Sequence, residues 1–166
     1  MKRLLAILVI CAVPALCVDG IVPTLVKHLK TSKTYMAHLA DKMPEDGYSS
    51  KPNPAQMTFA EQLTHVAGSN AYFIAKITGA KSPIPEKPEK MDKASITKML
   101  NDSYDYVIKS VGALTPEQLH KEVDTPDGKM TGLEAVLFSM DHTAHHRGQC
   151  IVYLRVKNIA PPEYEF

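Results

Sequence analysis

The amino-acid sequence predicts an all-α protein, a four-helix bundle with a proline-rich crossover between the second and third helices. Apolar residues recur at three- and four-residue steps in four long segments. These segments are separated by stretches rich in proline, glycine and polar residues, and no strand-like alternation is evident. With 166 residues, 45% of them apolar, the chain has the length and composition of a single globular domain.

Residues 1–17 have the layout of a secretory signal peptide. A short basic start precedes an apolar run over residues 4–13, which is too short to span a membrane. Proline and small residues follow, so we expect cleavage after Ala15 or Cys17 and export to the periplasm or the exterior.

Two other interpretations of the N-terminus are less favoured. An acylated Cys17, as in a lipoprotein, is disfavoured because Leu16 is large for the position before the cysteine. An apolar helix packed in the core is the other alternative. The expected organisation is therefore a leader over residues 1–17 and one domain over residues 18–166.

The four long helices are expected over residues 20–43, 59–78, 93–111 and 132–156. Start signals support three of them: capping boxes from Thr58 to Glu61 and from Thr131 to Glu134, and an N-cap at Asp92. The last helix should pack through Leu133, Val136, Leu137, Met140, Ala144, Ile151, Val152 and Leu154.

The connections between these helices differ in character. Residues 81–91 contain three prolines and several lysines, which indicates an extended, exposed crossover. A further capping box at residues 115–118 starts only a short helical turn, and residues 123–128 form a tight polar turn.

The most informative segment is residues 141–149, with the sequence DHTAHHRGQ. His142 and His146 are four residues apart, so on a helix they lie one turn apart on the same face, at the spacing of two imidazoles that bind one metal ion. Gln149 and Tyr153 extend the same polar stripe. His145 can pair with His142 at three-residue spacing and therefore competes with His146 as the second ligand.

His65, near the middle of the second long helix, is the candidate third ligand. Three neutral imidazoles would hold a divalent ion that acts as a Lewis acid and keeps open positions. Glu61 and Asp141 could accept a proton from a ligand's second ring nitrogen and are also the catalytic candidates. Taken alone, His65 is better interpreted as a core histidine. For the pair on the last helix, a solvated histidine-rich face is as good an interpretation as metal binding.

Residues 57–67 (MTFAEQLTHVA) together with residues 141–149 resemble the DinB family, which belongs to the DinB/YfiT-like metalloenzyme superfamily. The close of the chain, Tyr153-Leu154-Arg155 followed by Pro161-Pro162, is also similar to that family. The resemblance covers nearly the whole chain after the leader.

The resemblance implies a four-helix bundle in which His65, His142 and His146 bind a divalent metal, zinc or nickel. It also implies an activity among metal-dependent hydrolases or thiol S-transferases, on an unknown small-molecule substrate, and a possible homodimer. The leader departs from the pattern of the better-understood thiol transferases, which are cytoplasmic. This departure argues against thiol transfer as the reaction.

Other function classes find little support in the sequence. The formal net charge is +1 and tryptophan is absent, so we expect no nucleic-acid partner. Cys150 is the only cysteine beyond the leader, and no basic partner that would activate it can be named. The two hypotheses that remain are an exported metalloenzyme of DinB type and a non-catalytic helical bundle that binds metal or a protein partner.

Overall fold

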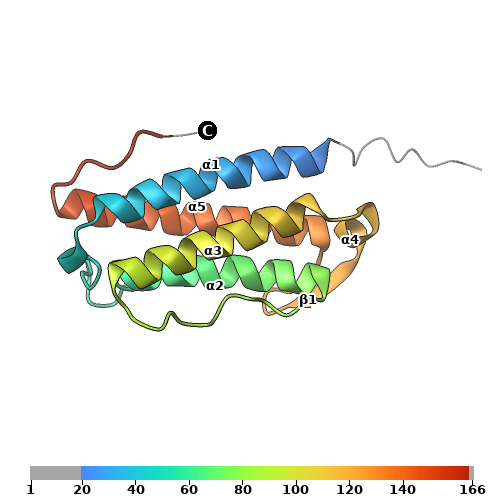
Figure 1. Ribbon diagram of the computed structural model, residues 1–166, viewed down its shortest axis with the longest axis horizontal. Coiled ribbons are helices and arrows are strands. Elements are labelled where there is room, and N and C mark those ends of the chain that lie inside the picture. Colours follow the sequence, from blue (N-terminus) through green and yellow to red (C-terminus); the bar gives the residue numbers. More distant parts are fainter. Residues whose placement is uncertain (1–19, 165–166) are drawn as a thin grey trace, which may run out of the picture.

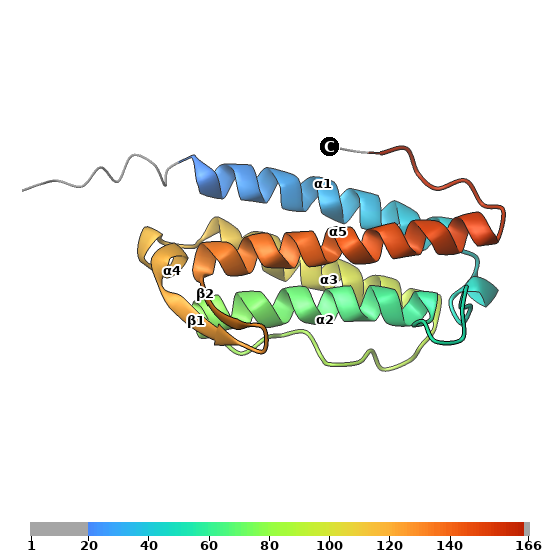
Figure 2. The ribbon, with the colours of Figure 1, turned by 180° about the vertical axis from the view of Figure 1, so that it is seen from behind.

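The computed structural model describes residues 20–164 and confirms the helical bundle. The signal-peptide prediction falls on residues outside this range. Four long helices lie lengthwise beside one another (Figures 1 and 2). They are α1 (Ile21–Lys42), α2 (Phe59–Thr78), α3 (Lys93–Gly112) and α5 (Gly132–Val156). Shorter elements join them: the 3-10 turn η2 (Glu45–Gly47), α4 (Pro116–His120), β1 (Glu122–Thr125) and β2 (Gly128–Thr131).

The start signals in the sequence operate as predicted. The side chains of Thr58 and Thr131 each accept a hydrogen bond from the backbone N–H of the glutamate three residues later. The carboxylate of that glutamate accepts in turn from the backbone N–H of the threonine. Asp92 accepts from the backbone N–H of Ser95 at the start of α3. Gly79 ends α2 with a φ of 71°, a conformation that glycine adopts without steric cost.

The proline-rich crossover has a geometric cause. Helices α2 and α3 run in the same direction, so the chain must return along the length of the bundle between them (Figure 1). Residues 80–92 make this return without helix or strand, alongside α2. The crossover thereby becomes one wall of a groove on the surface of α2.

The core consists of two apolar clusters that lie toward opposite ends of the bundle. One includes Met36, Leu39, Phe59, Leu63, Leu100 and Leu154, and the other includes Leu25, Leu29, Ile74, Val107, Val111 and Val136. Buried polar groups lie between them. Asn70 Nδ2 donates to Thr143 Oγ1 at 2.9 Å, which joins α2 to α5 and favours a single register between these two helices.

The sequence missed a β-hairpin. Residues predicted as a tight polar turn form antiparallel strands β1 and β2, with Glu122 opposite Thr131 and Thr125 opposite Gly128. Strands of four residues are too short to show a two-residue alternation in the sequence. Gly128 has a φ of 111°, which explains the glycine at the turn.

The predicted packing face of the last helix was partly wrong. Leu137 and Val152 are 48% and 45% exposed, whereas Val136 and Leu154 are buried as expected. Helix α5 packs mainly against α2 and only lightly against α1, so its outward side has no neighbouring helix among the described elements. Within residues 20–164, no helix combines the length and the apolar character that a membrane crossing requires.

Candidate metal centre

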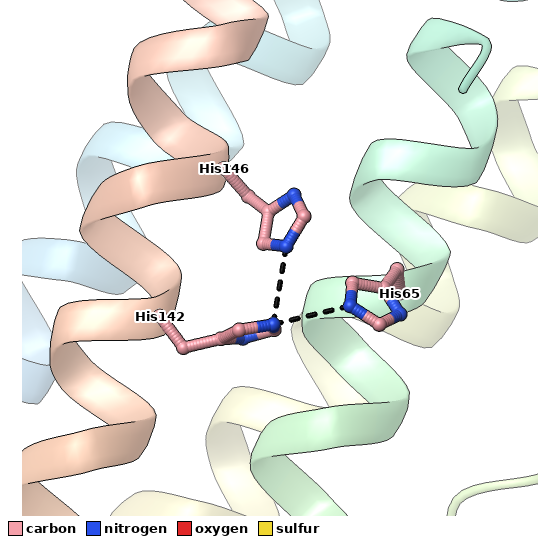
Figure 3. A group of neighbouring side chains, drawn as sticks. All are labelled: His65, His142 and His146. Atoms are coloured by element: carbon pink, nitrogen blue, oxygen red, sulfur yellow. Dashed lines mark hydrogen bonds between the residues drawn. The ribbon is translucent and has the colours of Figure 1, made fainter. Parts of the chain in front are cut away.

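Three histidines from two helices converge at one point between α2 and α5 (Figure 3). Helix α2 contributes His65, and α5 contributes His142 and His146 from successive turns of one face. The Nε2 atom of His142 lies 3.1 Å from the Nε2 of His65 and 3.1 Å from the Nε2 of His146. One ligand nitrogen from each residue lies within 4.8 Å of the other two.

The spacing of these nitrogens suits a shared metal ion. Zinc–imidazole bonds of about 2.0–2.1 Å place neighbouring ligand nitrogens about 2.8–3.4 Å apart, from octahedral to tetrahedral angles. Both nitrogen pairs at 3.1 Å fall inside that range. The three histidines could therefore hold a metal ion, with further coordination positions left for other ligands.

The surroundings keep the three imidazoles neutral. Burial lowers the pKa of His65, and burial followed by the neighbouring histidines lowers the pKa of His142, where Asp127 and Asp141 act in the opposite direction. Burial and then His142 and His65 lower the pKa of His146 to about 4. A neutral imidazole has the lone pair that a metal ion needs, so the protonation state of the cluster at neutral pH is compatible with metal binding.

The second ring nitrogens of the two α5 histidines are placed differently. His146 Nδ1 lies 2.5 Å from Gln62 Oε1, a buried amide oxygen on α2. His142 Nδ1 is buried and has no hydrogen-bond partner among the described residues. Of these two histidines, only His146 thus has a hydrogen bond at Nδ1 that fixes its ring.

His146, and not His145, belongs to the histidine cluster. The ring of His145 lies 5.0 Å from that of His146, yet its side chain is exposed and it is absent from the nitrogen cluster. A helix turns by about 100° per residue, so a residue one position away from a buried ligand points to a different face. His146 therefore joins His142 and His65, and His145 lies outside.

The two predicted carboxylates lie away from the imidazoles. The Glu61 carboxylate accepts from the backbone N–H of Thr58 at 2.6 Å and from Thr58 Oγ1 at 3.0 Å. These hydrogen bonds lower the pKa of Glu61 and keep it at the start of α2. Asp141 is exposed and does not line the groove. Neither carboxylate forms a hydrogen bond with a histidine of the cluster.

A groove of about 1270 Å³ runs over the outer surface of α2 and reaches His65 and His142. The crossover forms one wall, and Pro126 and Asp127 of the hairpin turn contribute from another side. Aromatic rings lie beside the histidines: Phe138 stacks on His142 with ring centroids 6.4 Å apart and contacts Phe73 at 5.1 Å. The histidine cluster is therefore reachable from outside the bundle.

Sequence reasoning missed Gln62, Phe138 and Asp127. Gln62 precedes His65 by three residues and Phe138 precedes His142 by four, so helical spacing could have placed each beside a ligand. Asp127 gave no such signal, because its position follows from the hairpin. Cys150 is buried, and burial raises the pKa of its thiol to about 12, in agreement with a structural cysteine.

Comparison with known proteins places this arrangement in a family. A family model described as the DinB superfamily matches residues 28–150, which include all three histidines. The uncharacterised protein YjoA of Bacillus subtilis (strain 168) is 29% identical over 135 residues, spanning 79% of this chain and 87% of YjoA.

Solved structures agree with this match. The crystal structure of YjoA, a DinB-like protein, has a TM-score of 0.71 at 28% identity and covers 86% of this chain and 96% of its own. A DinB-like protein from Bacillus cereus ATCC 10987 has a TM-score of 0.70 at 16% identity, covering 89% of this chain and 97% of its own, and shares the fold. On the family match and its fit to the fold, the chain belongs to the DinB superfamily.

Proposed function

We propose that this protein binds one divalent transition metal ion, zinc or nickel, through His65, His142 and His146, and uses it in a hydrolase or transferase reaction on a small molecule. The convergence of three neutral imidazole nitrogens beside an accessible groove is the observation that carries this proposal. Imidazole ligands suit both metals and do not select between them.

In the proposed reaction, different residues bind the metal and the substrate. The three histidines hold the ion, which when bound supplies Lewis-acid chemistry toward a substrate group in the groove. Phe138 and Phe73 offer an apolar surface for the part of the substrate next to the reacting group. Lysines at positions 51, 76, 81 and 87 line the same groove and would attract an anionic group at its margins.

A proton acceptor has to reach the groove, and Glu61, Glu86 and Asp127 line it whereas Asp141 does not. Asp127 also acts on His142, whose pKa its charge raises, so it is the best placed of these carboxylates. Glu61 also lines the groove, but its hydrogen bonds to Thr58 and its lowered pKa make it a weak base. Asp141 is exposed on α5, next to His142 in the chain.

The alternative is a non-catalytic bundle that binds metal or a protein partner. It is favoured by one observation: Gln62, a neutral amide, is the only side chain outside the cluster with a hydrogen bond to the three histidines among residues 20–164. The two functions make different demands on the groove, because a catalyst must admit a substrate and a structural site need not.

A turnover panel separates the two. Protein stripped with a chelator and reloaded with zinc or nickel is tested on esters, amides and thiol-transfer substrates. Turnover that disappears on stripping and returns on reloading supports the enzyme. Metal binding without turnover on any substrate class supports the bundle.

Export and self-association complete the proposal. The leader-like residues 1–17 support export, which mass spectrometry of the secreted protein would test by finding a mature N-terminus near Leu16 or Val18. A homodimer is proposed from the family resemblance, and light scattering of the purified protein measures it directly.

A further inference from the structure

Gln62 is the residue in the described structure whose environment the proposed function leaves unexplained. It is a neutral amide, 4% exposed, on α2 between His146 and Tyr153 of α5. Its Oε1 lies 2.5 Å from His146 Nδ1, and its Nε2 lies 3.4 Å from the hydroxyl of Tyr153. A buried polar side chain with partners at both ends is held in one orientation.

The direction of these hydrogen bonds is fixed from the far end. The Tyr153 hydroxyl donates to the backbone carbonyl of Met57, and a carbonyl oxygen can only accept. The Tyr153 hydroxyl has one proton, which it donates to this carbonyl, so its oxygen must accept the hydrogen bond from Gln62. The amide nitrogen of Gln62 therefore faces Tyr153, and its oxygen faces His146.

This orientation determines the tautomer of His146. An amide oxygen facing Nδ1 requires a proton on Nδ1, and a neutral imidazole carries only one ring proton. Nε2 is then a bare lone pair, and it is the atom that faces His142 and His65. His142 lacks such control, since its Nδ1 has no partner among the described residues.

We infer that Gln62 is a positioning residue that holds His146 in the Nδ1–H tautomer. It does so through hydrogen bonds that run from the backbone carbonyl of Met57 through Tyr153 to Gln62. The Nε2 atom of His146 is thereby left unprotonated and available to a metal ion before the ion binds. The tautomer of His146 follows from the hydrogen bonds alone. The role of that tautomer in metal binding rests on the proposed function. A neutral acceptor also leaves the ligand less basic than a carboxylate would, which keeps a bound metal more electrophilic.

Nitrogen-15 NMR of the metal-free protein tests the tautomer without any variant. Long-range proton–nitrogen correlations from the ring of His146 should show the proton on Nδ1. A ring protonated on Nε2 in the wild-type, metal-free protein would overturn the inference, whatever the protein's affinity for metal.

Zinc titration of variants tests the consequence. Gln62→Met keeps the length of the side chain and removes the acceptor, and we expect zinc affinity to fall about 10- to 100-fold. Gln62→Glu keeps an acceptor, so the His146 tautomer should stay as in the wild type, and zinc affinity should be equal or higher because a carboxylate makes the ligand more basic. Gln149→Met is the matched control: Gln149 lies on α5 three residues after His146, is half-buried, and has no hydrogen bond to the cluster.

The outcomes separate the inference from the proposed function. Equal zinc affinity for wild type and a folded Gln62→Met would overturn a positioning role. If Gln62→Met fails to fold, a changed His146 tautomer in Gln62→Glu would overturn it instead. Wild-type protein that binds no zinc or nickel would refute the proposed function, while the NMR result would still decide whether Gln62 sets the ring.

Discussion

His65 and His142 are 77 residues apart in the chain, and their Nε2 atoms lie 3.1 Å apart. Helix α2 presents one and helix α5 the other, and the buried Asn70–Thr143 pair helps to fix the register between these helices. The Nε2 of His146 lies at the same distance from the Nε2 of His142. This spacing of three nitrogens would suit ligands around a common metal ion.

The stability of the metal-free protein should fall in acid. The pKa of His146 is about 4 in the folded protein and near 6.5 when unfolded, so between these values the unfolded chain binds more protons. Stability is then full above about pH 6.5 and is lost as the pH falls toward 4, by at most about 3 kcal/mol from this residue. Urea denaturation at pH 7.5 and pH 5 measures the difference.

A matched pair of variants assigns that pH dependence. His146→Gln should reduce it, leaving the smaller share from His65 and His142, whereas His145→Gln, which changes an exposed side chain on the same turn, should leave most of it. Equal stability at both pH values in the wild type would contradict the effect of burial on the cluster.

The proton acceptor is tested by exchanging carboxylates for amides. Asp127→Asn should lower turnover on the order of 10²-fold with metal content unchanged, as expected for loss of a general base. Glu61→Gln should leave turnover unchanged, because a glutamine at this position still completes the capping box, as Gln118 does in α4. A large loss in Glu61→Gln with no loss in Asp127→Asn would reverse the assignment.

The groove is tested by filling it. A Cβ added at Gly68 meets nothing within 4 Å, and Gly68 lines the groove one turn after His65. Gly68→Leu should therefore keep the metal and the fold, with helix stability equal or higher by about 0.5–1 kcal/mol, while it lowers turnover by blocking the substrate.

Gly148→Leu is the control for this substitution. Gly148 is also a helical glycine with open space around it, on α5, and it does not line the groove. Equal turnover in the two leucine variants would mean that substrate does not use the groove.

Much of the fold could be predicted from the sequence because its signals are local. The capping boxes at Thr58 and Thr131, the N-cap at Asp92 and the glycine at position 79 each fix a helix end through hydrogen bonds a few residues long. The hairpin could not be predicted, because its four-residue strands depend on pairing with each other.

Only part of the candidate site could be predicted from local signals in the sequence. The spacing of His142 and His146 lies within one helix, but the approach of His65 depends on how α2 packs on α5, for which the sequence supplies only the resemblance to the family. Leu137 and Val152 looked like core residues because periodicity identifies an apolar face and does not say whether another helix covers it.

The metal content of the purified protein tests the central claim most directly. Elemental analysis should find about one zinc or nickel ion per chain in the wild type and in His145→Ala, and none in His65→Ala or His146→Ala. Retention of the metal by both His65→Ala and His146→Ala would contradict the three-histidine site. Loss of the metal from His145→Ala but not from His146→Ala would show that His145 takes the place assigned to His146.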